Sequence, residues 1–285
     1  MLEILHRLFS FAGTGELLRQ PFVHNALLAA AVLGLLAGLL APLIVTRGMT
    51  FAVHGTSELA FTGAAAALLL GANLRFGAIA GAVLASILFG LLGLRRGERD
   101  SVIGVVLAFG LGLGVLMLAL YHGRSANKFS LLTGSIVSVD PTGLALLTGC
   151  AVIVIAVLAV AYRPLLFASA DPDVAAARGV PVRILSLVFA VLIGLSTAMA
   201  VPVVGAILVL AVTVTPGAAA ARVSSNPVVV TALSILFAEV ALVGGVILSL
   251  GPNLPISGYA ATLVFLCYVG CRLVARYRRA AVRTA

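Results

Sequence analysis

The sequence predicts an all-α protein, a polytopic membrane bundle of eight or nine transmembrane helices. Hydrophobic residues make up 62% of its 285 residues and charged residues only 9%, and the mean hydropathy is +1.23. A soluble domain carries about 25% charged residues, so a chain this apolar needs lipid around it. The composition therefore excludes soluble enzymes, disulfide-stapled domains and intrinsically disordered chains.

Apolar stretches long enough to cross a bilayer follow one another along the chain. A helix needs about 20 residues to cross the hydrocarbon core. The predicted spans are residues 26–46, 54–71, 74–94, 102–121, 143–162, 183–200, 202–214, 228–250 and 257–275. The short 202–214 stretch leaves the number at eight or nine. Two glycine pairs with four-residue spacing, Gly34/Gly38 and Gly77/Gly81, predict close contacts between helix backbones.

Basic residues lie mostly between these spans, which predicts the orientation of the chain. The 18 Lys and Arg residues outnumber nine Asp and Glu residues. Their position between apolar runs indicates a membrane protein that follows the positive-inside rule, and no nucleic-acid partner is expected. The cytoplasmic connections are predicted to hold Arg47, Arg95, Arg96, Arg99, Arg163, Arg178, Arg183, Arg222, Arg272, Arg276, Arg278, Arg279 and Arg283. The connections near 72–74, 122–142 and 251–256 are then outside.

The ends of the chain and the cysteines carry weaker signals. Residues 1–24 lack the apolar core of a signal peptide and are predicted to form an interfacial segment. Residues 25–276 then form one transmembrane domain and residues 277–285 a basic cytoplasmic tail. Cys150, Cys267 and Cys271 lie in apolar runs, so no disulfide framework is expected. Cys267 and Cys271 have the spacing of a soft-metal pair, but apolar packing is favoured.

Very few ionisable side chains lie inside the predicted spans, where each is energetically costly. His54 and Glu58 are four residues apart and share one helix side with the Ser57 hydroxyl. They are candidate ligands in a cation pathway, and the alternative is a salt-linked pair at the headgroup level. Glu239 lies near the middle of the 228–250 span. It is either part of a pathway or a neutral glutamic acid hydrogen-bonded to a neighbouring helix.

The chain has no machinery of its own for catalysis or energy coupling. It contains no Gly-x-x-x-x-Gly-Lys phosphate loop, and its single lysine, Lys128, lies in a predicted external loop. It contains no His-Glu-x-x-His motif of a metallohydrolase. No internal repeat of the kind found in secondary transporters is evident. The protein is therefore not expected to be an enzyme, and any coupling to ATP must come from a partner.

Two cytoplasmic segments are candidate docking sites for such a partner. Asp171-Pro172 is a helix-start signal, and Gly179 ends the short helix that it opens. Pro216 precedes an alanine run, which predicts a second short helix. The candidate coupling residues are Asp171, Pro172, Thr215, Pro216, Gly217, Ala218, Ala219 and Arg222. Short Ala-rich helices suit docking into a groove on another protein, and the alternative is a plain interhelical connection.

Several of these stretches together resemble the permease subunits of metal-importing ABC transporters, the family that serves zinc, manganese and iron. The similar stretches are the one that begins at Pro21 and leads to Arg47-Gly-Met-Thr-Phe, the Asp-Pro-x-x-Ala-x-x-x-Gly-x-Pro pattern from Asp171, the segment 203–222 and, more weakly, Leu131-Leu-Thr-Gly-Ser-Ile136. One motif departs from the family. Its members carry Asp, then His four residues later, then Leu-Pro-Gly, where this chain has His54, Glu58 and Phe61-Thr62-Gly63.

The resemblance implies a permease of the type II importer class in a bacterial plasma membrane. Two copies of the chain would line a pathway, two ATP-binding subunits would dock on the cytoplasmic segments, and an external metal-binding protein would deliver the ion. A divalent metal would be the substrate, and no permanently bound cofactor is expected. Two alternatives stay open at this point: an ion- or proton-coupled carrier or channel that uses Glu239, and a permease for a non-metal substrate.

Overall fold

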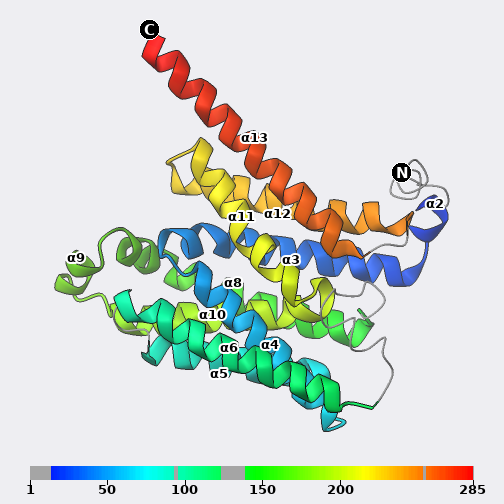
Figure 1. Cartoon of the computed structure of the whole chain (residues 1–285). Helices are drawn as coiled ribbons and strands as arrows, with labels where there is room; N and C mark the ends of the chain where they lie inside the picture. The colour runs from blue at the N-terminus through cyan, green and yellow to red at the C-terminus, as the bar shows by residue number, and fades with distance from the viewer. Residues whose placement is uncertain (1–13, 93–95, 123–138, 253–254, 285) are drawn as a thin grey trace.

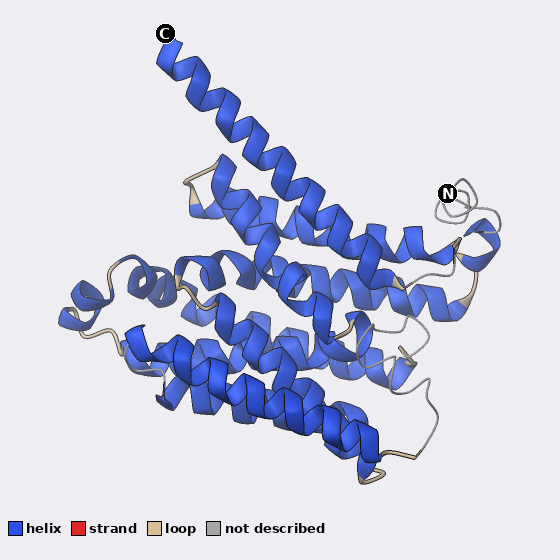
Figure 2. Cartoon of the chain, viewed as in Figure 1, coloured by secondary structure: helices blue, strands red, loops and turns tan. Residues whose placement is uncertain are grey.

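The computed structural model describes residues 14–92, 96–122, 139–252 and 255–284, and within these ranges every regular element is a helix (Figure 2). The long helices are α3 (Pro21–Thr46), α4 (Thr50–Leu69), α5 (Leu74–Leu92), α6 (Arg96–Leu120), α8 (Pro141–Ala170), α10 (Val182–Val204), α11 (Ala206–Val223), α12 (Pro227–Leu250) and α13 (Ile256–Thr284). Two short helices, α2 (Thr14–Leu17) and α9 (Pro172–Ala177), accompany them. The predicted all-α bundle is confirmed.

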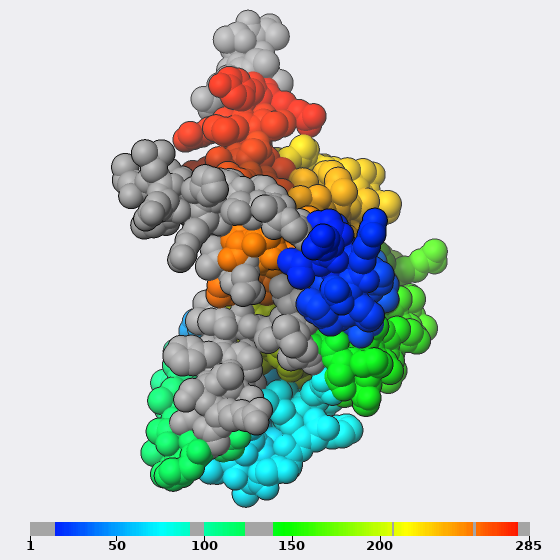
Figure 3. Space-filling model, turned by 90° about the vertical axis from the view of Figure 1, so that its right-hand side faces the viewer, coloured from blue at the N-terminus to red at the C-terminus, as the bar shows by residue number. Residues whose placement is uncertain are grey.

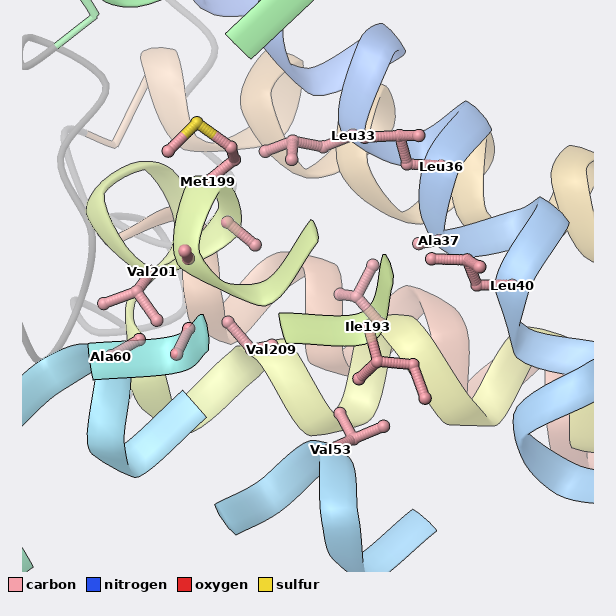
Figure 4. Close-up of a cluster of buried hydrophobic side chains, with 14 of the residues drawn as sticks. Leu33, Leu36, Ala37, Leu40, Val53, Ala60, Ile193, Met199, Val201 and Val209 are labelled. Atoms are coloured by element: carbon pink, nitrogen blue, oxygen red, sulfur yellow. The ribbon is translucent and has the colours of Figure 1, made fainter. Parts of the chain in front are cut away.

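The helices pack in two connected groups. Helix α4 packs against α5, α6 and α10, whereas α3 packs against α12, α11 and α8. Helix α11 touches both groups, and α13 lies along α11 and α12 (Figure 1). Figure 4 shows part of the buried core, to which Leu36 of α3, Val53 of α4, Ile193 of α10 and Val209 of α11 all contribute side chains.

The two ends of the bundle differ. Helix α9 and the C-terminal end of α13 lie at one end (Figure 1), together with Arg47 at the end of α3 and Arg222 at the end of α11. We call this the basic end. The other end, which faces the viewer in Figure 3, holds the start of α3, the α4–α5 connection and the start of α8. Arg47 and Arg222, two of the predicted cytoplasmic arginines, thus lie at the same end of the bundle.

Helix boundaries in the second half differ from the sequence prediction. The break expected near residue 201 is wrong, because α10 continues through Pro202 to Val204. The chain turns instead at Gly205, whose φ of 86° is a backbone conformation that favours glycine. The predicted short apolar stretch 202–214 corresponds to α11, but the separate helix expected after Pro216 is wrong, because α11 runs unbroken from Ala206 through Pro216 to Val223.

Helix α4 is more polar than the helices around it. Among the described residues, seven helices are long and apolar enough to cross a membrane, and α4 is not one of them. It carries His54, Ser57 and Glu58 in its first half, and most of its surface is buried by other helices. A bundle interior accepts such groups more readily than lipid does. The helix begins at Thr50, one turn before the predicted start at residue 54. His54 and Glu58 therefore lie one turn further inside the helix than the sequence predicted.

Glycines let α4 and α5 approach each other closely. A Cβ atom on Gly63 would overlap the Gly77 carbonyl oxygen, and one on Gly81 would overlap the Leu59 carbonyl oxygen. The same device acts between α3 and α12, where a Cβ on Gly38 would overlap the backbone of Ile235. The close contacts predicted from the glycine spacing are confirmed, and they hold α4 firmly against its neighbour.

An ion pair ties α5 to α8 at the end of the bundle opposite the basic end. Arg75 at the start of α5 donates to the carboxylate of Asp140, which also caps α8 by accepting from the Gly143 N–H at 3.1 Å. Partial burial acts to raise the pKa of Asp140, but the hydrogen bonds and the charge of Arg75 outweigh it. The pKa of Asp140 therefore lies below its ordinary value of 3.8.

We expect Asp140→Asn to destabilise the protein slightly at neutral pH and not at all in acid. Asparagine keeps the cap but loses the ion pair, which for an exposed pair contributes less than about 1 kcal/mol. Because the folded-state pKa is lowered, this stability is present above pH 3.8 and is lost as the pH falls below it. Melting curves of both proteins at pH 7 and pH 3 check this: an equal difference at both pH values would contradict the ion-pair explanation.

Candidate functional site

His54 and Glu58 form a pair on the first half of α4. The imidazole Nδ1 and the carboxylate Oε1 are 4.0 Å apart, and the side chains are 35% and 10% exposed, respectively. At 1.5 Å per residue, Glu58 lies about 12 Å along the helix from its start at Thr50. The pair therefore lies one to two turns inside the helix, and the choice between a cation pathway and a salt-linked pair at the headgroup level stays a prediction.

The pair leaves ligand atoms available. Nδ1 of His54 is buried and makes no hydrogen bond to any of the described residues. The ring of Phe51, 6.4 Å from the imidazole between centroids, lies one turn before it. A buried polar atom without a partner is costly, and a bound ion is one of the partners that can satisfy it. One nitrogen and one oxygen donor therefore face each other at a spacing that a divalent cation can bridge.

Ser57 contributes less than its helix position predicted. Its side chain is fully buried, and its hydroxyl donates to the His54 carbonyl oxygen at 2.9 Å. The hydroxyl proton is thus used inside the helix, and only the oxygen lone pairs are left for another group. Its part in the pathway remains a prediction.

Within one chain, the candidate pair supplies two donor groups. No group of three or more His, Cys, Asp or Glu side chains within the described ranges is arranged to hold a metal ion. Closed structural metal sites use four protein ligands, whereas His54 and Glu58 supply two. Such an open, two-donor arrangement suits a cation that passes through.

Glu239 is not part of this group. It lies half-buried between α12 and α3, where a Cβ on Gly34 would be 2.9 Å from its carboxyl carbon. Gly34 has no β-carbon, and this leaves room for the carboxylate. No hydrogen bond or ion pair of Glu239 is present within the described part of the chain, so the predicted neutral, hydrogen-bonded form finds no partner there. A pathway role for Glu239 stays a prediction.

Helix α9 has the form predicted from Asp171-Pro172. The Asp171 carboxylate accepts from the N–H groups of Asp173 and Val174 at 3.1 and 3.0 Å, and the chain leaves the helix through Gly179 at a φ of 80°. Ala175 is buried against the bundle, while Val174, Ala176 and Ala177 are exposed. The short helix projects from the basic end (Figure 1).

The other candidate coupling segment lies differently. Pro216, Gly217 and Ala219 are buried in the bundle, and a Cβ on Gly217 would meet the backbone of Ala41 and Pro42 in α3. Thr215 and Ala218 are half-buried, and Arg222 is exposed. The Arg222 side chain reaches Tyr268 of α13, with Nη2 3.4 Å from the hydroxyl and Cζ 6.0 Å from the ring centroid. Only the end of this segment is therefore open to a partner protein.

Comparison with known proteins identifies the family. Residues 19–275 match the ABC 3 transport family. The chain belongs to the ABC 3 transport family. The resemblance found from the sequence motifs is thereby confirmed, as are the multi-pass membrane character and the permease fold. Members of the ABC 3 transport family are transport subunits.

Individual relatives of this ABC 3 transport family chain cover most of its length. It is 28% identical over 235 residues to the manganese transport system membrane protein MntC of Halalkalibacterium halodurans, covering 82% of this chain and 80% of the relative. It is 34% identical over 200 residues to the manganese import system permease protein ScaB of Streptococcus parasanguinis, covering 70% and 71%. A structure of PsaBC from Streptococcus pneumoniae in complex with Fab is similar at a TM-score of 0.81, with 27% identity over 91% of this chain and 94% of the other.

The long-range contacts of Arg47 could not be predicted from the sequence, and some of the predicted segments lie outside the residues that the structure describes. Arg47 was predicted only to mark the cytoplasmic side, but it contacts two other helices, and no local motif signals such long-range partners. The family-like segment 131–136, Lys128 and most of the predicted interfacial segment 1–24 lie outside the described ranges. The proposed domain boundaries at 24 and 276 remain predictions.

Proposed function

We propose that this chain is the membrane permease of an ABC transporter that imports manganese, driven by a separate ATP-binding subunit. The observation that carries the proposal is the match of residues 19–275 to the ABC 3 transport family, together with relatives named as manganese permeases. The paired His54 and Glu58 donors support a divalent cation as the substrate, because imidazole and carboxylate both bind first-row divalent metals.

The proposed docking site for the ATP-binding subunit is α9 with the exposed end of α11. Helix α9 projects from the basic end, and its exposed residues are small and mostly apolar, with Asp171 and Arg178 at its ends. A short helix of this kind inserts into a groove of a partner. Arg222 extends the surface, whereas Pro216, Gly217 and Ala219 support it from inside the bundle by packing on α3.

Two copies of the chain would complete the pathway. One chain offers two donor groups on α4 and, within its described residues, no third. A second copy related by two-fold symmetry would add another His54 and Glu58, so that a passing cation meets up to four donors without a permanent site. ATP binding and hydrolysis would favour one orientation of the bundles over the other and so release the ion.

ATP hydrolysis by the reconstituted complex tests this function and the choice of metal. The permease is purified with its ATP-binding subunit, placed in proteoliposomes and given its external binding protein loaded with Mn²⁺, Zn²⁺ or Fe²⁺. We expect hydrolysis to be stimulated most by the Mn²⁺-loaded protein. Failure of any ATPase to co-purify, or equal hydrolysis with all three metals and with none, would contradict the proposal.

A further inference from the structure

We propose that Arg47 is the positioning residue that connects the ATPase-docking helix α9 to the cation pair on α4. The inference rests on the proposed function, since it assigns a role in coupling transport to ATP hydrolysis. Arg47 caps the C-terminus of α3 at the basic end. Its guanidinium group reaches both helices that flank α9, namely α8 before it and α10 after it.

The contacts of the Arg47 guanidinium join three parts of the chain. Nη1 lies 3.2 Å from the Ser169 hydroxyl and 3.4 Å from the Leu165 carbonyl oxygen, both in the last turns of α8. Nη2 donates to the Ser186 hydroxyl of α10 at 2.7 Å. The guanidinium carbon lies 5.6 Å from the ring centroid of Phe189, one turn further along α10. We call this set of contacts the Arg47 clasp.

The Arg47 clasp joins the two helix ends that flank α9. Only Asp171 separates the end of α8 at Ala170 from the start of α9, and α9 is followed within a few residues by α10 at Val182. A force applied to α9 by a docked subunit therefore acts first on the ends of α8 and α10. The Ser169 and Ser186 hydroxyls, one at each of these ends, are both held by the same guanidinium group.

The other side of the clasp leads to the cation pair. Arg47 is followed by Gly48, at a φ of 62°, and Met49, and α4 begins at Thr50. Only Gly48 and Met49 separate Arg47 from the start of α4, so the connection between Arg47 and the first turn of α4, just before His54, is short. A shift of the α8 and α10 ends is thus passed to the turn that positions His54 and Glu58, through direct contacts and not through a flexible loop.

Arginine is suited to this task where lysine is not. Its planar fork places two N–H-bearing nitrogens toward different helices while the flat face stacks on an aromatic ring. In the Arg47 clasp the two nitrogens serve α8 and α10 separately, and the face lies over Phe189, which is fully buried. A lysine ammonium is a single point and cannot hold both hydroxyls in the same geometry.

The test measures Mn²⁺ uptake and ATP hydrolysis in the same proteoliposomes that contain the complete transporter. For Arg47→Gln we expect the number of ions imported per ATP to fall about tenfold, a size typical of coupling between sites, while ATP hydrolysis is retained. Arg47→Lys is expected to fall between this variant and the unchanged protein. Arg163→Gln removes a similar charge from an exposed position on α8 and is expected to leave the ratio unchanged.

A second variant distinguishes a loss of coupling from a failure to fold. Ser169→Ala with Ser186→Ala removes the two hydroxyl partners and keeps the arginine, and we expect it to lower the ratio in the same direction. If Arg47→Gln fails to assemble, this double variant decides. An unchanged ratio in it, or uptake and hydrolysis that fall in equal proportion, would overturn the role of Arg47. If the unchanged transporter itself imports no Mn²⁺, the proposed function fails, not this inference alone.

Discussion

Replacing both His54 and Glu58 with alanine is expected to abolish Mn²⁺ uptake while the transporter still assembles. The substitution removes the nitrogen and oxygen donors that face each other at 4.0 Å on α4. Within the described residues no other His, Cys, Asp or Glu joins them in a cluster, so no group is left there to replace the lost ligands. Uptake of radioactive manganese into proteoliposomes, with co-purification of the ATP-binding subunit as the measure of assembly, gives the result.

A matched control for this variant is available near the start of the chain. His24 and Glu16 are one imidazole and one carboxylate, both exposed, at the end of the bundle opposite the basic end. Alanine at both positions changes the composition equally but removes no donor on α4, so uptake should be unchanged. If the His54 and Glu58 variant imports Mn²⁺ at the rate of the unchanged protein, the pair is not in the cation pathway.

The second large effect concerns stability and comes from Gly81→Ala. The new methyl group would overlap the Leu59 carbonyl oxygen of α4, which is backbone and cannot turn aside. Overpacking of a tight core costs about 1–3 kcal/mol and sometimes more, so we expect a clear fall in the melting temperature. The displacement of α4 should also reduce transport, because α4 carries His54 and Glu58.

Gly112→Ala on α6 is the matched control for this change. Within the described residues nothing lies within 4 Å of the position that its Cβ would occupy. Alanine is intrinsically better in a helix interior than glycine by about 1 kcal/mol, so this variant should melt at the same temperature or higher. Melting curves of the two variants in detergent compare them directly. Equal melting temperatures would show that the α4–α5 contact is not tight.

Much of the fold could be predicted because the physics that decides it is local. Each span needs only an apolar stretch of sufficient length, and the glycine pairs signal close contact through their spacing alone. The same reasoning misplaced the break between α10 and α11. The predicted spans end at residue 200 and restart at 202, but α10 continues through Pro202, because a proline is tolerated inside a membrane helix when its surroundings compensate, and the turn falls at Gly205.

The site was harder to predict because its parts depend on tertiary contacts. Four-residue spacing correctly brought His54 and Glu58 together, since that contact lies within one helix. The same kind of reasoning could not show that Pro216 and Gly217 are buried against α3. Nor could it find the Arg47 clasp, whose partners Ser169 and Ser186 are 122 and 139 residues away in the sequence.

ATP-dependent uptake of radioactive manganese tests the central claim most directly. Proteoliposomes hold the permease with its ATP-binding subunit, and the Mn²⁺-loaded binding protein is added on the opposite side to the ATP. We predict uptake that requires ATP, the ATP-binding subunit and the His54 and Glu58 pair. Uptake that continues without ATP or the ATP-binding subunit, and that stops when Glu239 is replaced by glutamine, would instead identify an ion-coupled carrier or channel and contradict this account.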